Sequence, residues 1–290
     1  MTVLCLIANP AAPELDPNLA SAVCAAVGGS LRWLHRPVAC EIIDPQAPDP
    51  LRIARELIGS RAVDAALVPS ANRRKRVLVA DMDSTMIQQE CIDELAAVLG
   101  LKETVSEITA RAMRGELDFG QALETRVALL KDLELRRIEE VRSKNITLTP
   151  GGRVLVQTMR AHGAYASLVS GGFTVFADYF AELLGFDEAV ANVLEFSGNR
   201  LTGTVAKPIV DKTTKLRRLQ DIAGERGISL ADTMAVGDGA NDLEMIRAAG
   251  LGVAIHAKPA VAAEAAVRID HGDLTALLYL QGYSAEEFAV

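Results

Sequence analysis

Aromatic side chains and positive charge are both scarce in this 290-residue chain. Aromatic residues make up 4% of it, and 30 basic residues stand against 38 acidic ones, which gives a net charge of −8. Few aromatics disfavour a platform for stacked bases, and the acidic balance disfavours a nucleic-acid-binding surface. We therefore expect no nucleic-acid partner, and an anionic substrate would need a local positive site.

Cysteines and long apolar runs are also few. The four cysteines form no C-x-x-C pair, so neither a disulfide framework nor a thiolate zinc site is expected. No apolar run reaches the ~18 residues of a membrane-spanning helix, and the first residues lack the basic region of a secretory signal. Half of the residues are apolar and 23% are charged, which is typical of a folded chain of two domains. We expect a cytoplasmic protein with no membrane partner.

Residues 1–70 predict a small α+β domain. Apolar runs and turn residues give the order strand–helix–strand–strand–helix–strand, which is that of a ferredoxin-like domain of the regulatory amino-acid-binding type. The strands are expected at 2–8, 31–34, 38–43 and 64–69, and the helices at 16–28 and 50–58. The basic run 70–76 then indicates a solvated linker, and an acidic partner for it is the less favoured alternative.

Residues 77–290 alternate short β-rich runs with longer helical patterns, which predicts a parallel sheet with crossover helices. An insertion at about 86–148 is far longer than an ordinary crossover, and its helical periodicity predicts a cap over the sheet. The strands are expected at 77–80, 165–169, 189–193, 233–236 and 252–255, and the cap helices at 87–99, 105–114, 118–130 and 135–141.

Acidic residues stand at the ends of two predicted strands. Asp81 and Asp83 follow the apolar run at 77–80, and Asp238 follows the run at 233–236. Ligands of open parallel sheets bind at the carboxyl ends of the strands, and Mg²⁺ prefers carboxylate oxygens. A lone D-x-D is most often a polar turn. Two such strand ends in one sheet favour a divalent-cation site instead.

A third strand end and a helix carry groups that suit an anion. Ser170 and Gly171 follow the run at 165–169 and are expected to open the next helix, where backbone N–H groups attract anions. An ordinary serine N-cap is an equally good explanation of that pair alone. Lys215 lies on a predicted helix before the Asp238 strand, and a lysine there is usually solvated.

Taken together, these segments resemble the four motifs of the haloacid-dehalogenase-like phosphohydrolase superfamily. The motifs are Asp81-Met82-Asp83-Ser84-Thr85, Ser170, Lys215 and Gly237-Asp238-Gly239-Ala240-Asn241-Asp242. The resemblance implies a Rossmann-like sheet, a mobile cap inserted after the first motif, and Mg²⁺. Because Asp83 is present, it also implies cleavage of phosphate esters rather than of carbon–halogen bonds.

The resemblance assigns a role to each motif residue. Asp81 would attack phosphorus and become an aspartyl phosphate, while Asp83 would protonate the leaving alcohol and then activate water. Mg²⁺ would be held by Asp81, Asp238 and the backbone carbonyl of Asp83. The phosphate oxygens would be bound by Ser170, a neighbouring glycine N–H and Lys215.

The cap segments 86–96 and 113–133 further resemble those of the phosphoserine phosphatases. That likeness implies O-phospho-L-serine as substrate, in the last step of serine synthesis, with Glu90 on the ammonium and Arg126 on the carboxylate. Both residues also have a structural explanation. Glu90 can be an acid that the helix dipole favours in a first turn, and Arg126 can be a cation that lies along the surface of the cap. The remaining assignments place Met113 and Phe119 in the closed cap, Asn241 near the substrate, and Asp242 behind Lys215 or the metal.

Three other hypotheses stay open at this point. The cap can select another phospho-amino acid, such as phosphothreonine or phosphohomoserine, and an alcohol can replace water as the phosphoryl acceptor. Residues 1–70 can also serve mainly as an amino-acid sensor. They have Ala8-Asn9-Pro10 in place of a glycine-rich ligand loop, which favours a structural role or a homodimer contact.

Overall fold

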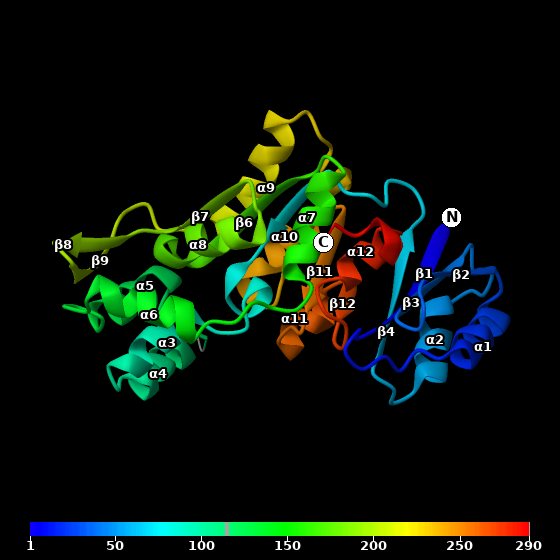
Figure 1. The fold of residues 1–290 in the computed structure, drawn as a ribbon, viewed down its shortest axis with the longest axis horizontal. Helices are drawn as coiled ribbons and strands as arrows, with labels where there is room; N and C mark the ends of the chain where they lie inside the picture. The colour runs from blue at the N-terminus through cyan, green and yellow to red at the C-terminus, as the bar shows by residue number, and fades with distance from the viewer. Residues whose placement is uncertain (114–115, 290) are drawn as a thin grey trace.

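The computed structural model describes residues 1–113 and 116–289, without the side chain of Met113. Within these residues, strands form an antiparallel sheet of four, a parallel sheet of six and a hairpin of two. Figure 1 shows the antiparallel sheet at one end of the molecule, the parallel sheet in the middle and the helical cap at the other end. The described part of the chain contains no helix with the length and apolar character needed to cross a membrane.

The N-terminal sheet has the predicted element order. Its strands are β1 (Thr2–Ala8), β2 (Ser30–His35), β3 (Ala39–Ile43) and β4 (Val63–Pro69), in the spatial order β2-β3-β1-β4, with helices α1 (Pro17–Val27) and α2 (Pro50–Ile58). Alternate residues of β1 enter different apolar clusters: Leu4 and Leu6 pack with the two helices, whereas Cys5 and Ile7 join the core of the parallel sheet. Both faces of this sheet are therefore covered.

The parallel sheet has β5 at its centre. The spatial order is β12-β11-β10-β5-β6-β7, so β5 lies between β10 and β6. The strands are β5 (Val77–Ala80), β6 (Tyr165–Phe173), β7 (Glu188–Asn192), β10 (Thr233–Gly237), β11 (Leu251–Ile255) and β12 (Val267–Ile269). The helices are α7 (Gly152–Ala161), α8 (Thr174–Leu184), α9 (Lys212–Glu225), α10 (Leu243–Ala248), α11 (Pro259–Glu264) and α12 (Ala276–Leu280).

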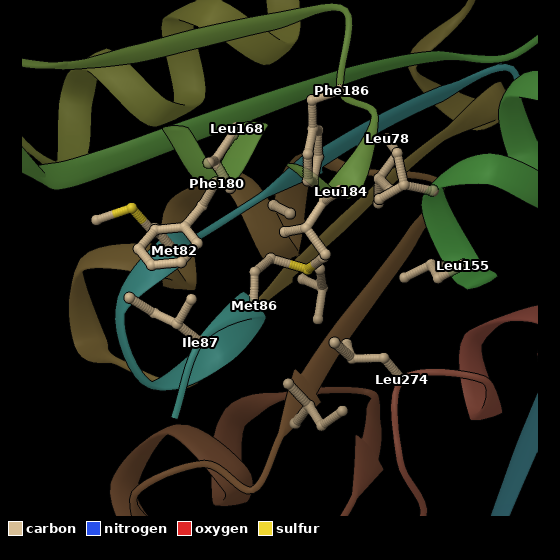
Figure 2. Packing of buried hydrophobic residues seen from close by; sticks show 14 of the residues in the cluster. Leu78, Met82, Met86, Ile87, Leu155, Leu168, Phe180, Leu184, Phe186 and Leu274 are labelled. Atoms are coloured by element: carbon tan, nitrogen blue, oxygen red, sulfur yellow. The ribbon is translucent and has the colours of Figure 1, made fainter. Parts of the chain in front are cut away.

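Apolar side chains anchor the segment that follows β5. Figure 2 shows Met82, Met86 and Ile87 packed with Leu168 of β6 and Phe180 of α8. All five side chains are at most 2% exposed. This packing fixes the backbone between the methionines, so the polar residues there have defined positions.

The cap consists of α3 (Cys91–Val98), α4 (Lys102–Met113), α5 (Phe119–Ala128) and α6 (Leu135–Lys144). The first of these begins four residues later than the sequence predicts, because the backbone is extended at Ile87 and again at Glu90, the residue before the helix. Ile87 and Leu148 pair through an isolated bridge at the base of the insertion.

Three strands were not expected from the sequence. They are β12 and the two strands of a hairpin, β8 (Leu194–Ser197) and β9 (Arg200–Val205). The hairpin attaches to the cap through backbone bonds: Asp132 N donates to Leu201 O at 2.9 Å, and Leu201 N donates to Leu133 O at 3.0 Å. Its partner thus lies some seventy positions earlier in the chain, where no local sequence pattern could indicate it.

The expected solvated linker is wrong at Arg73 and Lys75, whereas Arg74 and Arg76 are exposed. The Arg73 side chain is 12% exposed, and its guanidinium binds the fully buried Glu41 at 2.8 Å and the Leu280 carbonyl at 3.1 Å. Lys75 is also buried, and its Nζ donates to Ala231 O at 2.6 Å. The run joins the two sheets because the N-terminal sheet places a carboxylate opposite it.

We expect Arg73→Ala to lower the free energy of unfolding by about 2–4 kcal/mol, because it removes one of two arginine partners from the buried Glu41 carboxylate. Arg74→Ala is the matched control: this neighbour is 47% exposed in its pair with Glu287, and its loss should cost under about 1 kcal/mol. Urea unfolding of both variants measures the difference. Equal effects would show that Arg73 is no tie between the sheets.

Candidate active site

The carboxyl end of β5 brings the predicted strand-end residues together. Ala80 pairs with Val236 of β10 on one side and with Leu168 of β6 on the other. Asp81 N donates to Val236 O at 3.0 Å, which continues the pairing one residue further. Asp81 therefore stands between the segments that carry Asp238 and Ser170.

Lys215 is buried between two carboxylates. Its Nζ lies 2.6 Å from Asp81 Oδ1 and 2.7 Å from Asp242 Oδ1, and the lysine side chain is 1% exposed. Burial lowers the pKa of Lys215, but the two anions outweigh it and raise that pKa, so the amine stays charged. Burial, with Asp242, raises the pKa of Asp81, and Lys215 opposes this. The cluster thus holds two buried carboxyl groups against one buried cation.

Glycine at position 237 makes room for Asp242. A Cβ on Gly237 would lie 2.3 Å from Asp242 Cγ, a distance that no side chain can tolerate. Gly239 N then donates to Asp242 Oδ2 at 3.0 Å. Both oxygens of Asp242 are thus engaged, one by Lys215 and one by the backbone, and this carboxylate holds the lysine in place.

Oxygens of Asp81, Asp238 and Asp242 lie within 4.8 Å of one another, and all three residues are buried. Burial raises the pKa of Asp238 to about 6. The charge of Lys258 lowers this pKa, while Asp242 and Glu90 raise it further. The contacts of Asp238 with Thr85 (3.4 Å) and Lys258 (3.7 Å) are long, so its oxygens remain free for another ligand. Hard oxygen donors that outnumber the one buried cation fit a divalent cation.

Asp83 has hydrogen-bond partners outside the cluster of Asp81, Lys215 and Asp242. Its Oδ1 accepts from Cys91 N at 2.9 Å, and its Oδ2 lies 3.4 Å from Ser170 Oγ. The turn that allows this includes Ser84 in the left-handed region, at φ 56°. Burial and the nearby Glu90 raise the pKa of Asp83 to about 6, although the hydrogen bonds from Cys91 lower it. Such a carboxyl can carry a proton near neutral pH and also give it up.

Ser170 and Gly171 lie on a strand, whereas the sequence predicts that they begin the next helix. β6 continues to Phe173, and α8 starts at Thr174 without a side-chain cap. Ser170 is buried, and its Oγ accepts from Gly172 N at 2.8 Å. Sequence reasoning missed Gly172: a Cβ there would lie 2.7 Å from Asp83 Oδ2, so glycine at this position leaves room for the Asp83 carboxylate.

The cap contributes the remaining predicted residues. Glu90 is exposed and accepts from Ser84 Oγ at 2.8 Å. Arg126 is half-buried, and its NH1 lies 3.3 Å from Thr109 Oγ1. Burial lowers the pKa of Arg126, and the negative charges of Asp93, Glu90 and Asp83 oppose this shift.

Phe119 reaches from the cap to the core. A Cβ on Gly171 would come within 3.2 Å of its ring, so the aromatic side chain lies against the Ser170 segment. Met113 ends α4, but its side chain is outside the described residues. Asn241 is half-buried, with Oδ1 only 2.4 Å from where a Cβ on Gly239 would lie. Phe119 thus lies beside the Ser170 segment and Asn241 beside Gly239, next to Asp238 in the chain.

The comparisons with known proteins identify the fold and its family. A model of the haloacid dehalogenase-like hydrolases matches residues 78–247. The chain belongs to this family. It is 46% identical over 242 residues to a phosphoserine phosphatase of Streptomyces coelicolor, across 82% of this chain and 59% of that protein. The chain thus spans about three fifths of the length of that curated relative.

Two solved structures resemble this haloacid dehalogenase-like hydrolase closely. A probable phosphoserine phosphatase of Vibrio cholerae superposes with a TM-score of 0.81 at 33% identity, over 99% of this chain and 88% of that one. A phospho-aspartyl intermediate analogue of phosphoserine phosphatase superposes with a TM-score of 0.66 at 40% identity, over 71% of this chain and 98% of that one. The first likeness includes the N-terminal sheet as well as the core, which confirms the predicted fold class.

Proposed function

We propose that this haloacid dehalogenase-like hydrolase cleaves O-phospho-L-serine to L-serine and inorganic phosphate. The observation that carries the proposal is the Asp81 carboxylate, held by Lys215 beside Asp83 and Ser170 at the end of the central strand. The relatives support the substrate, since the Streptomyces coelicolor protein is a phosphoserine phosphatase and the Vibrio cholerae protein is a probable one.

In the first step, an oxygen of Asp81 attacks phosphorus, and the bond from phosphorus to the serine oxygen breaks. Both protein contacts of the Asp81 carboxylate, with Lys215 and Met82 N, fall on Oδ1, so Oδ2 is the better nucleophile. Asp83, in its protonated form, gives its proton to the departing serine oxygen. The products of this step are L-serine and an aspartyl phosphate.

In the second step, water attacks phosphorus and breaks its bond to Asp81. Asp83, now ionised, takes the proton from that water, so it returns to its starting state. Lys215, the Ser170 hydroxyl and backbone N–H groups beside it bind the phosphoryl oxygens in both steps. The solved analogue of a phospho-aspartyl intermediate in a phosphoserine phosphatase supports such a species in a relative.

Mg²⁺ would be held by Asp81, Asp238 and the backbone carbonyl of Asp83. When bound, the ion would offset the repulsion between the carboxylates and the phosphate. The site's excess of carboxylates over cations supports this choice of a divalent ion.

Glu90 and Arg126 would recognise the amino-acid part of the substrate, the first its ammonium and the second its carboxylate. We expect Arg126→Met to raise the KM for O-phospho-L-serine about 100-fold, since a charge-assisted contact is lost, and to leave cleavage of an aryl phosphate nearly unchanged. Phosphate release with Mg²⁺, from both substrates, measures this.

Arg136→Met is the control, because Arg136 lies on α6 with its side chain 82% exposed. Equal losses on both substrates would remove Arg126 from substrate recognition. Preference of the wild-type protein for phosphothreonine, or phosphoryl transfer to an added alcohol, would overturn the proposed substrate or acceptor.

We further infer that residues 1–70 support the core and provide the contact between two copies of the chain. The edge strand β2 supports this, since its outer side has no strand partner among the described residues. Light scattering of the purified protein tests the dimer.

The free thiols at positions 5, 24, 40 and 91 support a reducing compartment, the cytoplasm.

A further inference from the structure

Asn192 is a buried polar side chain that the proposed mechanism leaves without a role. It ends β7 and is 1% exposed. Val169 pairs with Val190 and Phe173 pairs with Asn192. The chain therefore advances four residues along β6 while it advances two along β7. The bulge that results contains Ser170, and Asn192 stands directly beside it.

The Asn192 amide makes three hydrogen bonds, to two separate segments. Its Nδ2 donates to Gly171 O at 2.9 Å and to Val210 O at 3.2 Å, and its Oδ1 accepts from Val210 N at 2.8 Å. The orientation of the amide follows from these partners, because exchanging its oxygen and nitrogen would set the oxygen against two carbonyls. Few other side chains offer two donors and one acceptor in this space.

The first of these segments is the anion-binding bulge. The peptide between Gly171 and Gly172 is held at both ends: its carbonyl accepts from Asn192, and its N–H donates to Ser170 Oγ at 2.8 Å. A peptide is planar, so these two bonds fix its orientation. Two adjacent glycines would otherwise leave this backbone with wide conformational freedom.

The second segment leads into the helix of Lys215. Val210 immediately precedes Asp211, which caps α9 by accepting from Thr214 N at 3.0 Å. Lys215 follows within the first turn of that helix. Asn192 therefore ties the Ser170 bulge to the start of the helix that carries the buried cation.

We propose that Asn192 is a positioning residue for the phosphoryl group, setting the distance between the Ser170 bulge and Lys215. This inference rests on the proposed function, in which those two elements bind the same phosphoryl oxygens. The ligand it serves is the set of three phosphoryl oxygens, in the group being transferred and in the phosphate product.

Asn192→Asp is the decisive variant, since it has the same shape and keeps the acceptor for Val210 N. It replaces the amide donor with a carboxylate oxygen that faces the carbonyls of Gly171 and Val210. We expect the affinity of the Mg²⁺-loaded protein for inorganic phosphate, measured by calorimetry, to fall at least about tenfold. We expect kcat to fall by a similar factor with little change in KM, and Mg²⁺ affinity without phosphate to stay within about twofold.

Asn199→Asp is the control, an exposed amide in the β8–β9 turn given the same change of charge. The inference would be overturned if Asn192→Asp bound phosphate within about twofold of the wild-type affinity. It would also be overturned if Mg²⁺ affinity fell in parallel with phosphate affinity, because that would indicate general damage to the site. Phosphate binding needs no turnover. A failure of the proposed function is therefore seen separately, as wild-type protein that binds phosphate without releasing it from phosphoserine.

Discussion

Asp81→Asn is expected to lower kcat for O-phospho-L-serine by about 10⁴-fold or more, because an amide does not form the acyl phosphate that the proposed mechanism requires. The substitution keeps the shape of the side chain. It also removes one of the buried carboxylates around Lys215, which keeps its partner Asp242 at 2.7 Å. When a chelator has removed all metal, the variant should therefore unfold at a temperature no lower than that of the wild-type protein.

Phosphate release and thermal unfolding measure these two effects on the same samples. Asp221→Asn is the matched control, since Asp221 is an exposed carboxylate on α9, near the lysine in sequence. Its activity should equal that of the wild-type protein. Residual turnover in Asp81→Asn within about tenfold of wild type would exclude Asp81 as the nucleophile.

Lys215→Met is expected to combine a loss of activity with a large loss of stability. It leaves the Asp81 and Asp242 carboxylates buried without their cation, which should cost about 3–5 kcal/mol in the absence of metal. At this chain length such a loss lowers the unfolding temperature by roughly 10 °C. The loss of a group that binds phosphoryl oxygens should lower kcat by about 10²–10³-fold.

The stability loss should depend on pH and on metal. Burial raises the pKa of Asp81, and without Lys215 that pKa rises further. A carboxyl with a raised folded-state pKa contributes stability at low pH, and that contribution is lost as pH rises through the folded pKa. The defect of Lys215→Met should therefore be smaller at pH 5 than at pH 8, and added Mg²⁺ should reduce it at pH 8.

Thermal unfolding at the two pH values, with and without Mg²⁺, tests this set of expectations. Lys212→Met serves as the control on the same helix, because its side chain is 58% exposed and its pair with Glu244 is worth at most about 1 kcal/mol. A defect in Lys215→Met that is equal at both pH values and unaffected by Mg²⁺ would contradict the charge balance described for the cluster.

Much of this arrangement could be predicted because it depends on local patterns. The strand over residues 77–80 is an uninterrupted apolar run that stops at an aspartate, and the structure has β5 with those bounds. The element order of the first 70 residues is correct for the same reason: apolar runs alternate with clear turn signals. Neighbouring strand ends then bring Asp81, Asp238 and Ser170 together, as expected for a parallel sheet.

The features that could not be predicted depend on partners distant in sequence. β12 has only three residues, too few for a periodic pattern, and it is defined by its pairing with β11. Arg73 in a basic run looks solvated until the buried Glu41 is placed beside it. Gly172 and Asn192 gain their importance from contacts across the sheet, with Asp83 and with Val210.

The basic run between the two sheets also bears on proteolysis. Four consecutive basic residues, 73–76, form the most obvious trypsin target in the chain. A protease must draw its substrate into an extended, unbonded conformation, yet Lys75 N donates to Gln281 Oε1 at 2.8 Å and Arg76 N donates to Asp232 O at 2.7 Å. Cleavage there requires the junction to open first. The resistance of this segment to trypsin is thus a direct report on how firmly the N-terminal sheet holds to the rest of the molecule.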